Sequence, residues 1–149
     1  TNWITCYTWN DDNMYFDLRN GGSTYGYFDY LSTVIAGTWF HLACVFDGTG
    51  VSDADKIKIY INGVEQTLSY NGTLPTSTNA TQGDFRIGSL ESYTQEWLGG
   101  IDEIAIFDYA LSERQIVQDI YEGRRDPKCA DLNNISNLTA PVAWYRMGD

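Results

Sequence analysis

Short segments with the composition of β-strands recur along this chain, separated by clusters of Gly, Asn, Asp and Ser. Closely spaced short strands with turn signals between them are typical of a β-sandwich or a barrel, whereas an α/β fold alternates its strands with longer helical segments. This rhythm predicts an all-β protein. The expected strands cover residues 3–9, 14–18, 25–31, 40–46, 57–61, 64–68, 85–87 and 101–107.

The sharpest turn signal is the dipeptide formed by Asn62 and Gly63. Before it, residues 57–61 alternate isoleucine with lysine or tyrosine, as a strand with one buried face does. Asn-Gly is the preferred sequence of a two-residue hairpin turn, because both central residues of that turn need a positive φ. Residues 57–61 should therefore pair with the segment that begins at Val64. The polar residues 70–83 are expected to form a long surface loop.

One short helix is expected, and both of its ends carry a signal. Ser112 stands at an N-cap position and Gln115 follows three residues later, so that the hydroxyl and the amide can satisfy backbone donors reciprocally. Apolar residues then recur at helical spacing. Gly123 supplies a left-handed C-cap. The helix should cover residues 113–122 and pack its apolar stripe on a sheet.

Four motifs follow one another in a characteristic order. They are Trp39-Phe-His-Leu-Ala43 leading to Asp47-Gly48, Ile59-Tyr-Ile-Asn-Gly63, Arg86-Ile-Gly88, and Gly100-Ile-Asp-Glu-Ile104 leading to Ala110-Leu-Ser112. In this order they resemble the laminin-G-like and pentraxin-like domains of the concanavalin A type. The resemblance implies a two-sheet antiparallel jelly-roll sandwich with one short helix near residues 113–122.

The resemblance assigns residues 1–123 to this domain, with an N-terminus that is truncated relative to the family's full first strands. Residues 124–149 form a tail in which Pro127 ends any helix and residues 142–147 return to strand composition. We expect this last strand to close the domain's own sheet. The alternative is that it opens a further copy of the domain in a longer, repeated polypeptide.

Charge and hydropathy argue against two classes of partner. A net charge of −11 would repel nucleic acid, since binding to a polyanion relies on clustered lysine and arginine. No apolar run approaches the roughly 20 residues that a membrane-spanning helix needs, so direct insertion into a membrane is not expected. A length of 149 residues suits one domain rather than two.

The three cysteines, Cys6, Cys44 and Cys129, are too far apart in the sequence for a zinc site, which uses closely spaced pairs. Cys6 and Cys44 fall in expected strands, and the resemblance to pentraxin-like domains implies a disulfide between them in an oxidising compartment. The alternative is that both are small buried hydrophobic residues.

No catalytic residues are expected. Glycan-cleaving relatives with this type of jelly roll carry three acidic residues on one strand face, and retaining hydrolysis needs two carboxyl groups about 5 Å apart. The comparable positions are Glu103, Ala105 and Phe107, which leave a single acid. The only histidine, His41, has no sequence partners for a nucleophilic triad, so a structural role is favoured. A glycoside hydrolase is therefore the least favoured function.

Calcium is a candidate cofactor, because it takes about 6 to 8 oxygen ligands, many of them from loops. Asp12 and Asn13 precede an expected strand and resemble the pentraxin loop whose Asp-Asn pair binds calcium. The family's second acidic loop corresponds to the region after Gly88, where Glu91 is the candidate ligand. The alternative is a set of solvated turns in which Asp and Asn bond their own backbone.

Aromatic residues suggest a glycan site. The chain has 11 Tyr and 5 Trp, and sugars stack their apolar faces on such rings while polar neighbours bind their hydroxyls. Trp9, Tyr93 and Trp97 lie in or beside expected loops, and Asn10 adds a polar neighbour. These four residues form the candidate glycan site. The alternative is that Trp39 and most of the tyrosines fill the sandwich core.

These observations favour a non-catalytic module for adhesion or recognition, which binds a glycan or a surface protein through loops at one end of the sandwich, with or without calcium. The expected location is extracellular, on a cell surface or on a virion. A second class of function is a structural module of a larger surface, fibre or virion protein, whose partner is another copy of itself. A fold alone does not decide between them.

Overall fold

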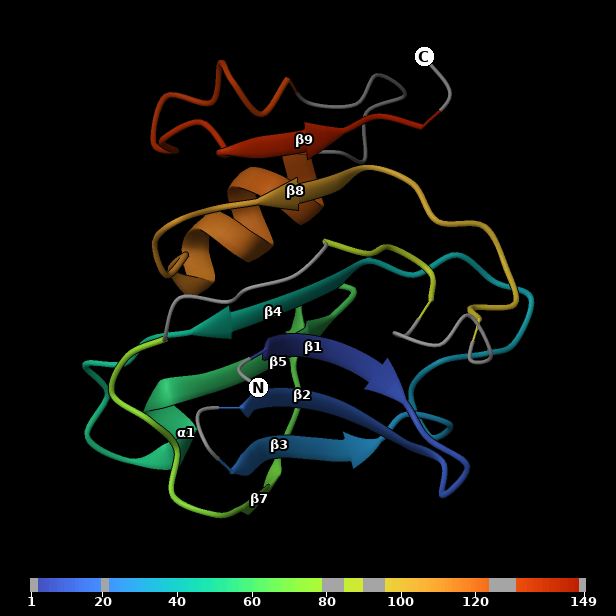
Figure 1. Cartoon of the computed structure of the whole chain (residues 1–149). Helices are drawn as coiled ribbons and strands as arrows, with labels where there is room; N and C mark the ends of the chain where they lie inside the picture. Colours follow the sequence, from blue (N-terminus) through green and yellow to red (C-terminus); the bar gives the residue numbers. More distant parts are fainter. Residues whose placement is uncertain (1–2, 20–21, 79–84, 90–95, 124–130, 148–149) are drawn as a thin grey trace.

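The computed structural model describes residues 3–19, 22–78, 85–89, 96–123 and 131–147. Two antiparallel sheets face each other, and a short helix and a separate two-stranded sheet cover the outer face of one of them (Figure 1). This arrangement confirms the predicted all-β sandwich with one short helix near residues 113–122.

The first sheet has the strand order β1-β2-β3-β7 and the second has the order β4-β5-β6. The strands of the first sheet are β1 (Trp3–Thr8), β2 (Asn13–Arg19), β3 (Ser23–Asp29) and β7 (Ser69–Asn71). Those of the second are β4 (Leu42–Phe46), β5 (Ile57–Ile61) and β6 (Val64–Glu65), and the single turn α1 (Asp53–Lys56) leads into β5. Every pairing in both sheets is antiparallel.

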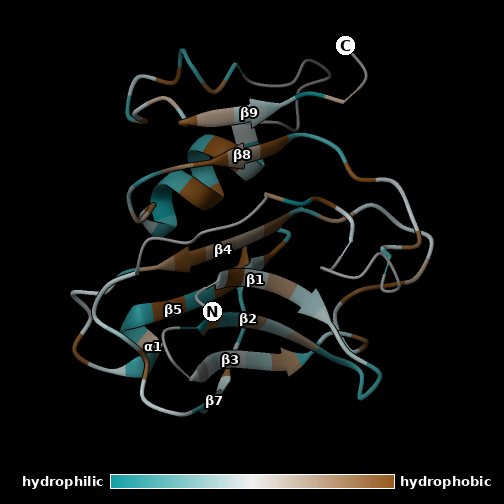
Figure 2. Ribbon diagram, viewed as in Figure 1, coloured by the Kyte–Doolittle hydropathy of each residue, from teal (hydrophilic) through white to brown (hydrophobic). Residues whose placement is uncertain are grey.

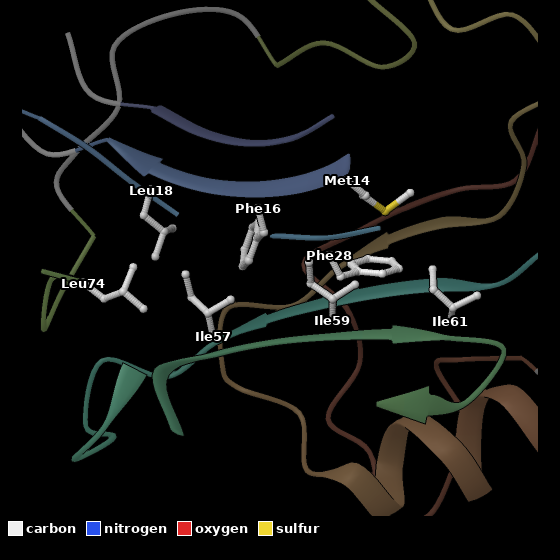
Figure 3. Close-up of a cluster of buried hydrophobic side chains, with 8 residues drawn as sticks. All are labelled: Met14, Phe16, Leu18, Phe28, Ile57, Ile59, Ile61 and Leu74. Carbon is white, nitrogen blue, oxygen red and sulfur yellow. The ribbon is translucent and has the colours of Figure 1, made fainter. Parts of the chain in front are cut away.

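The core lies between the two sheets. Alternation along β2 directs Met14, Phe16 and Leu18 towards β5, which supplies isoleucines at every second position from Ile57 to Ile61 (Figure 3). Each of these isoleucines is at most 1% exposed, and burial of such a side chain contributes roughly 1.5–3 kcal/mol. The hydrophobic residues of β4 and β5 stand out against the paler β1 to β3 in Figure 2.

The hairpin predicted at Asn62 and Gly63 is confirmed. Asn62 has a φ of 51° and Gly63 a φ of 77°, and Ile61 pairs with Val64 across the turn. A Cβ atom on Gly63 would lie 2.7 Å from the Tyr121 ring, so a side chain at this position would require Tyr121 to move and would strain the backbone.

The predicted capping box at the start of the helix is also confirmed. The backbone N–H of Ser112 donates to Gln115 Oε1 at 2.9 Å, and the backbone N–H of Gln115 donates to Ser112 Oγ at 3.4 Å. The helix η1 (Gln115–Glu122) continues from this turn with π-type, i→i+5 bonding. Ile116 packs against the second sheet, together with Val45 and Tyr60.

The left-handed C-cap predicted at Gly123 is wrong. Gly123 has a φ of −60° and a ψ of −21°, and its N–H donates to the carbonyl groups of Gln118 and Ile120. The helix therefore ends in a right-handed turn that satisfies its own last carbonyls, and no left-handed residue is needed there.

Several strand predictions differ from the structure, and one of them is the strand expected at residues 64–68, which ends at Glu65. Residues 85–87 form no strand, while part of the expected loop 70–83 belongs to β7, which pairs with β3. Gly26 explains this pairing, because a Cβ atom there would lie 3.0 Å from Leu68 and 3.3 Å from Tyr70. The small residue lets the segment around β7 pack closely on β3.

The strand expected at residues 101–107 is shortened to β8 (Ile104–Ile106), because Glu103 has a φ of 54° and interrupts the extended backbone. β8 pairs with β9 (Ala143–Tyr145), so that Ala105 lies opposite Trp144. This two-stranded sheet packs against η1 through Ile120, Leu132 and Leu138. The last expected strand is thus paired within the chain.

The thiols of Cys6 and Cys44 are both free, with their sulfur atoms 3.5 Å apart. The implied disulfide is not formed in this structure. The alternative of two buried residues is wrong for Cys6, which is exposed at the edge of the first sheet. Cys129 lies outside the described residues.

Candidate functional site

The turn between β1 and β2 carries most of the residues predicted for ligand binding. The backbone N–H of Trp9 donates to the Asn13 carbonyl at 3.0 Å, and Asp12 has a left-handed φ of 63°. The Asp12 carbonyl accepts the backbone N–H of Tyr30 at 3.1 Å, which joins this turn to the segment after β3. The Trp9 side chain is 47% exposed, and Asn10 is exposed beside it.

Asp11 holds this turn in shape. Its carboxylate accepts the Tyr15 hydroxyl at 2.6 Å and the backbone N–H of Asn13 at 3.3 Å. The Tyr15 hydrogen bond keeps the pKa of Asp11 below its ordinary value, and the same bond raises the pKa of Tyr15 to about 12. The Asp11 carboxylate is therefore committed to internal hydrogen bonds.

Two further tryptophans lie against a glycine pair. A Cβ atom on Gly100 would lie 2.7 Å from Cη2 of Trp39, and one on Gly99 would lie 3.1 Å from Nε1 of Trp97. Trp97 also packs edge-on against Phe40, with ring centroids 6.4 Å apart. Despite these contacts Trp39 is 73% exposed and Trp97 is 41% exposed. Both rings therefore present apolar surface to solvent.

The segments that carry these three tryptophans lie at the end of the sandwich where β1 and β3 end and β4 begins (Figure 1). We call the exposed residues Trp9, Trp39 and Trp97 the tryptophan end. Trp9 and Trp97 were predicted as glycan-binding residues. The alternative placed Trp39 in the core, and the structure corrects this, because Trp39 precedes β4 and rests on a glycine rather than between the sheets. The other predicted residues Tyr93 and Glu91 lie outside the described residues.

The described residues do not complete a calcium site. Within them, no group of three or more His, Cys, Asp or Glu side chains is placed to hold a metal ion. Asp12 and Asn13 supply two side chains with oxygen donors, whereas calcium takes about 6 to 8 oxygens. The neighbouring Asp11 carboxylate already bonds Tyr15 and the backbone of the turn.

Glu103, the remaining acid at the comparable hydrolase positions, accepts hydrogen bonds from two side chains. Its carboxylate accepts Trp144 Nε1 at 2.8 Å and Arg146 Nε at 3.3 Å. Ala105 and Phe107, at the other two positions, pack against the cluster beneath η1. Glu103 thus bonds two residues in and after β9, and the three compared positions offer a single carboxyl group.

His41 has structural neighbours. Its backbone N–H donates to Asn62 Oδ1 at 2.9 Å, and its ring lies 5.6 Å from that of Tyr121. These contacts place His41 beside the hairpin turn at Asn62.

A laminin G family model, described as the concanavalin A-like lectin/glucanases superfamily, matches residues 1–117. The chain belongs to this superfamily. Searches of curated proteins and of solved structures gave no match. Laminin G-like domains are generally non-catalytic and typically extracellular. Within the described part of this laminin G-like domain, none of the helices has the length and apolar character needed to cross a bilayer.

The aromatic outer face of the first sheet was not predicted from the sequence. Tyr7, Tyr15, Tyr25 and Tyr27 point away from the core, since their neighbours in β2 and β3 point into it. The signal was present in the alternation of β2, where Tyr15 and Asp17 stand between Met14, Phe16 and Leu18. Applied to the tyrosines, this alternation would have placed them on the outside of the laminin G-like domain.

Proposed function

We propose that this laminin G-like domain is a non-catalytic recognition module that binds a glycan at the tryptophan end. The observation that carries the proposal is the exposure of Trp9, Trp39 and Trp97 at one end of the sandwich, at 41–73% of their surface. Large exposed aromatic rings beside polar loops suit a sugar, because its apolar face stacks on a ring and its hydroxyls bond to polar neighbours. Asn10 and Asn13 supply such neighbours.

The extracellular, cell-surface or virion location is part of this proposal, as is assistance by calcium. For calcium, Asp12, Asn13 and Glu91 are the proposed ligands. A calorimetric calcium titration that gives no heat, and binding that is unchanged by a chelator, would remove the metal from the proposal and leave the glycan site intact.

A second candidate function is assembly with other copies of the chain. It is favoured by additional apolar side chains that are exposed in the segments of the tryptophan end, namely Leu31, Ile35 and Leu98, the last of which is 96% exposed. Exposed apolar residues that gather in one region often mark protein contacts. In a recognition module, the same exposed apolar residues would instead contact a different protein on a surface.

The experiment is a glycan array with the full chain and with Trp39→Ala and Trp97→Ala, each with and without chelator. Val51→Ala is the matched control, because Val51 is an apolar residue that is 97% exposed in the loop before α1, at the opposite end of the sandwich (Figure 1). We expect the tryptophan variants to lose binding and the control to keep it. An array without signal, together with concentration-dependent oligomers on a sizing column, would favour assembly instead.

A separate assay tests for catalytic activity. Incubation with soluble β-glucans should release no reducing ends. Release that disappears in Glu103→Gln would overturn the non-catalytic proposal.

A further inference from the structure

The outer face of the first sheet carries a row of stacked tyrosines. The strand register places Tyr7 of β1 beside Tyr15 of β2, and Tyr15 beside Tyr27 of β3. The ring centroids of Tyr7 and Tyr15 are 5.2 Å apart at 10°, and those of Tyr15 and Tyr27 are 5.3 Å apart at 18°. Tyr25 meets Tyr15 edge-on at 5.2 Å. We call these four residues the tyrosine face.

The stacking decides which part of each ring a ligand would meet. Side chains stand roughly perpendicular to a sheet, and the faces of Tyr7, Tyr15 and Tyr27 are turned towards one another. The row therefore directs ring edges and phenol hydroxyls away from the sheet. Ring edges carry partial positive charge and the hydroxyls both donate and accept, so this surface suits an oxygen-rich ligand.

The hydroxyls of the tyrosine face differ in their hydrogen bonding. Within the described residues, the Tyr15 hydroxyl bonds Asp11, and no hydrogen bond joins the hydroxyl of Tyr7, Tyr25 or Tyr27 to another side chain. On the next strand, β7, Asn71 lies opposite Tyr25 and Ser69 lies opposite Tyr27. The face thus combines tyrosine with serine and asparagine, a composition that protein-binding loops also use for adaptable polar contacts.

Trp9 connects the tyrosine face to the tryptophan end. Its ring meets that of Tyr7 edge-on, with centroids 6.3 Å apart. From Tyr27 to Tyr7 the row crosses three strands, which is about 10 Å at the usual strand spacing, and Trp9 extends it further. Such a surface is longer than a single sugar ring.

We propose that the tyrosine face binds an extended, uncharged polysaccharide chain that continues over Trp9 to the tryptophan end. This inference rests on the proposed function and specifies its ligand class. An anionic chain is disfavoured, because the protein carries a net charge of −11 and the Asp11 carboxylate bonds the Tyr15 hydroxyl in the tyrosine face itself.

The test compares chain lengths and removes single hydroxyls. Calorimetry would measure binding of the full chain to soluble β-glucan, xylan and galactomannan, to short oligosaccharides of each, and to the polyanion heparin. The variant is the double substitution Tyr25→Phe and Tyr27→Phe, which keeps the ring stacking and removes two hydroxyls. The matched control is Tyr145→Phe, because Tyr145 is 43% exposed on β9, outside the tyrosine face.

We expect at least one neutral polysaccharide to bind more tightly than its short oligosaccharides, and heparin to bind more weakly. Each lost hydrogen bond should weaken binding about two- to tenfold, with an unchanged melting temperature. The control should bind like the unmodified chain.

Three results would overturn the inference. Equal affinity for long and short chains, with no effect of the double variant but loss of binding in Trp97→Ala, would refute the tyrosine face and leave the proposed function standing. Preference for heparin would refute the neutral ligand class. Absence of binding to every glycan, with binding to a protein surface that the double variant abolishes, would assign the face to protein recognition and overturn the glycan proposal as well.

Discussion

At the scale of single residues, hydrogen bonds at the β1–β2 turn set protonation equilibria that can be measured. The bond from the Tyr15 hydroxyl is the main reason why the pKa of Asp11 lies below its ordinary value. A lowered folded-state pKa stabilises the fold above the unfolded pKa, near 3.9 for aspartate, and that contribution is lost as the pH falls through the folded pKa.

The substitution Tyr15→Phe should raise the pKa of Asp11 towards its ordinary value, because it removes this donor while keeping the ring. The measurement is an NMR titration of the Asp11 carboxyl carbon. Tyr27→Phe is the control, since Tyr27 stacks on Tyr15 without bonding Asp11. An Asp11 that titrates identically in all three proteins would refute the role given to this hydrogen bond.

The facing thiols lead to a second prediction at this scale. The Cys44 thiol donates to the sulfur of Cys6, and this bond, together with burial, raises the pKa of Cys44 well above its ordinary value. Because the thiolate is the reactive form, oxidation of the pair should be slow at neutral pH and become faster as the pH rises. In a Cys129→Ser background, mass spectrometry after treatment with oxidised glutathione should find a cross-linked peptide pair and the loss of two hydrogens.

The control for the thiol prediction is Cys6→Ser in the same background, which should give no internal cross-link. A Cys6–Cys44 pair that stays reduced at alkaline pH in the Cys129→Ser protein would contradict the prediction. Mixed disulfides with glutathione on Cys6 alone would contradict it too, since they would mean that Cys44 cannot reach its partner.

At the scale of elements, one side chain adds to the backbone pairing that attaches β9 to β8. Glu103 accepts bonds from Trp144 and Arg146, and its side chain is only 12% exposed. Glu103→Ala should lower the free energy of unfolding by about 1.5–3 kcal/mol, the usual range for hydrogen bonds to a charged group. Urea unfolding should record this as a lower midpoint at constant m.

Arg146→Ala serves as the comparison for Glu103. Its side chain is 40% exposed, so the ion pair is screened by solvent and its loss should cost at most about 1 kcal/mol. Equal effects of the two substitutions would mean that the buried bond to Trp144 contributes nothing measurable. That result would contradict the assigned role of Glu103.

At the scale of the whole molecule, local signals predicted the parts of the fold that depend on local chemistry. The turn at Asn62 and Gly63 and the capping box at Ser112 each follow from neighbouring residues, and both are present. The strand β7 escaped prediction because it depends on a distant small residue, Gly26. The late start of β8 was not predicted either, because the positive φ of Glu103 accompanies contacts with residues far along the chain.

The part of the candidate site that could be predicted is the assignment of its residues to loops. Trp9 and Trp97 fall in loops by sequence, and the segments that carry them lie at the same end of the sandwich (Figure 1). The exposure of Trp39 was not predictable, because it depends on Gly100 approaching from a segment about sixty residues further on. The tyrosine row likewise requires the register of three strands, which the composition of one strand cannot supply.

The position of β5 has a consequence for how the molecule opens. It lies between β4 and β6 in its own sheet, with the first sheet on one face and η1 on the other, and Ile57, Ile59 and Tyr60 are at most 1% exposed. Amide protons of β5 should therefore exchange with deuterium only through global unfolding, whereas those of β8 and β9 should exchange through local opening. Mass spectrometry of deuterated peptides would rank them in that order.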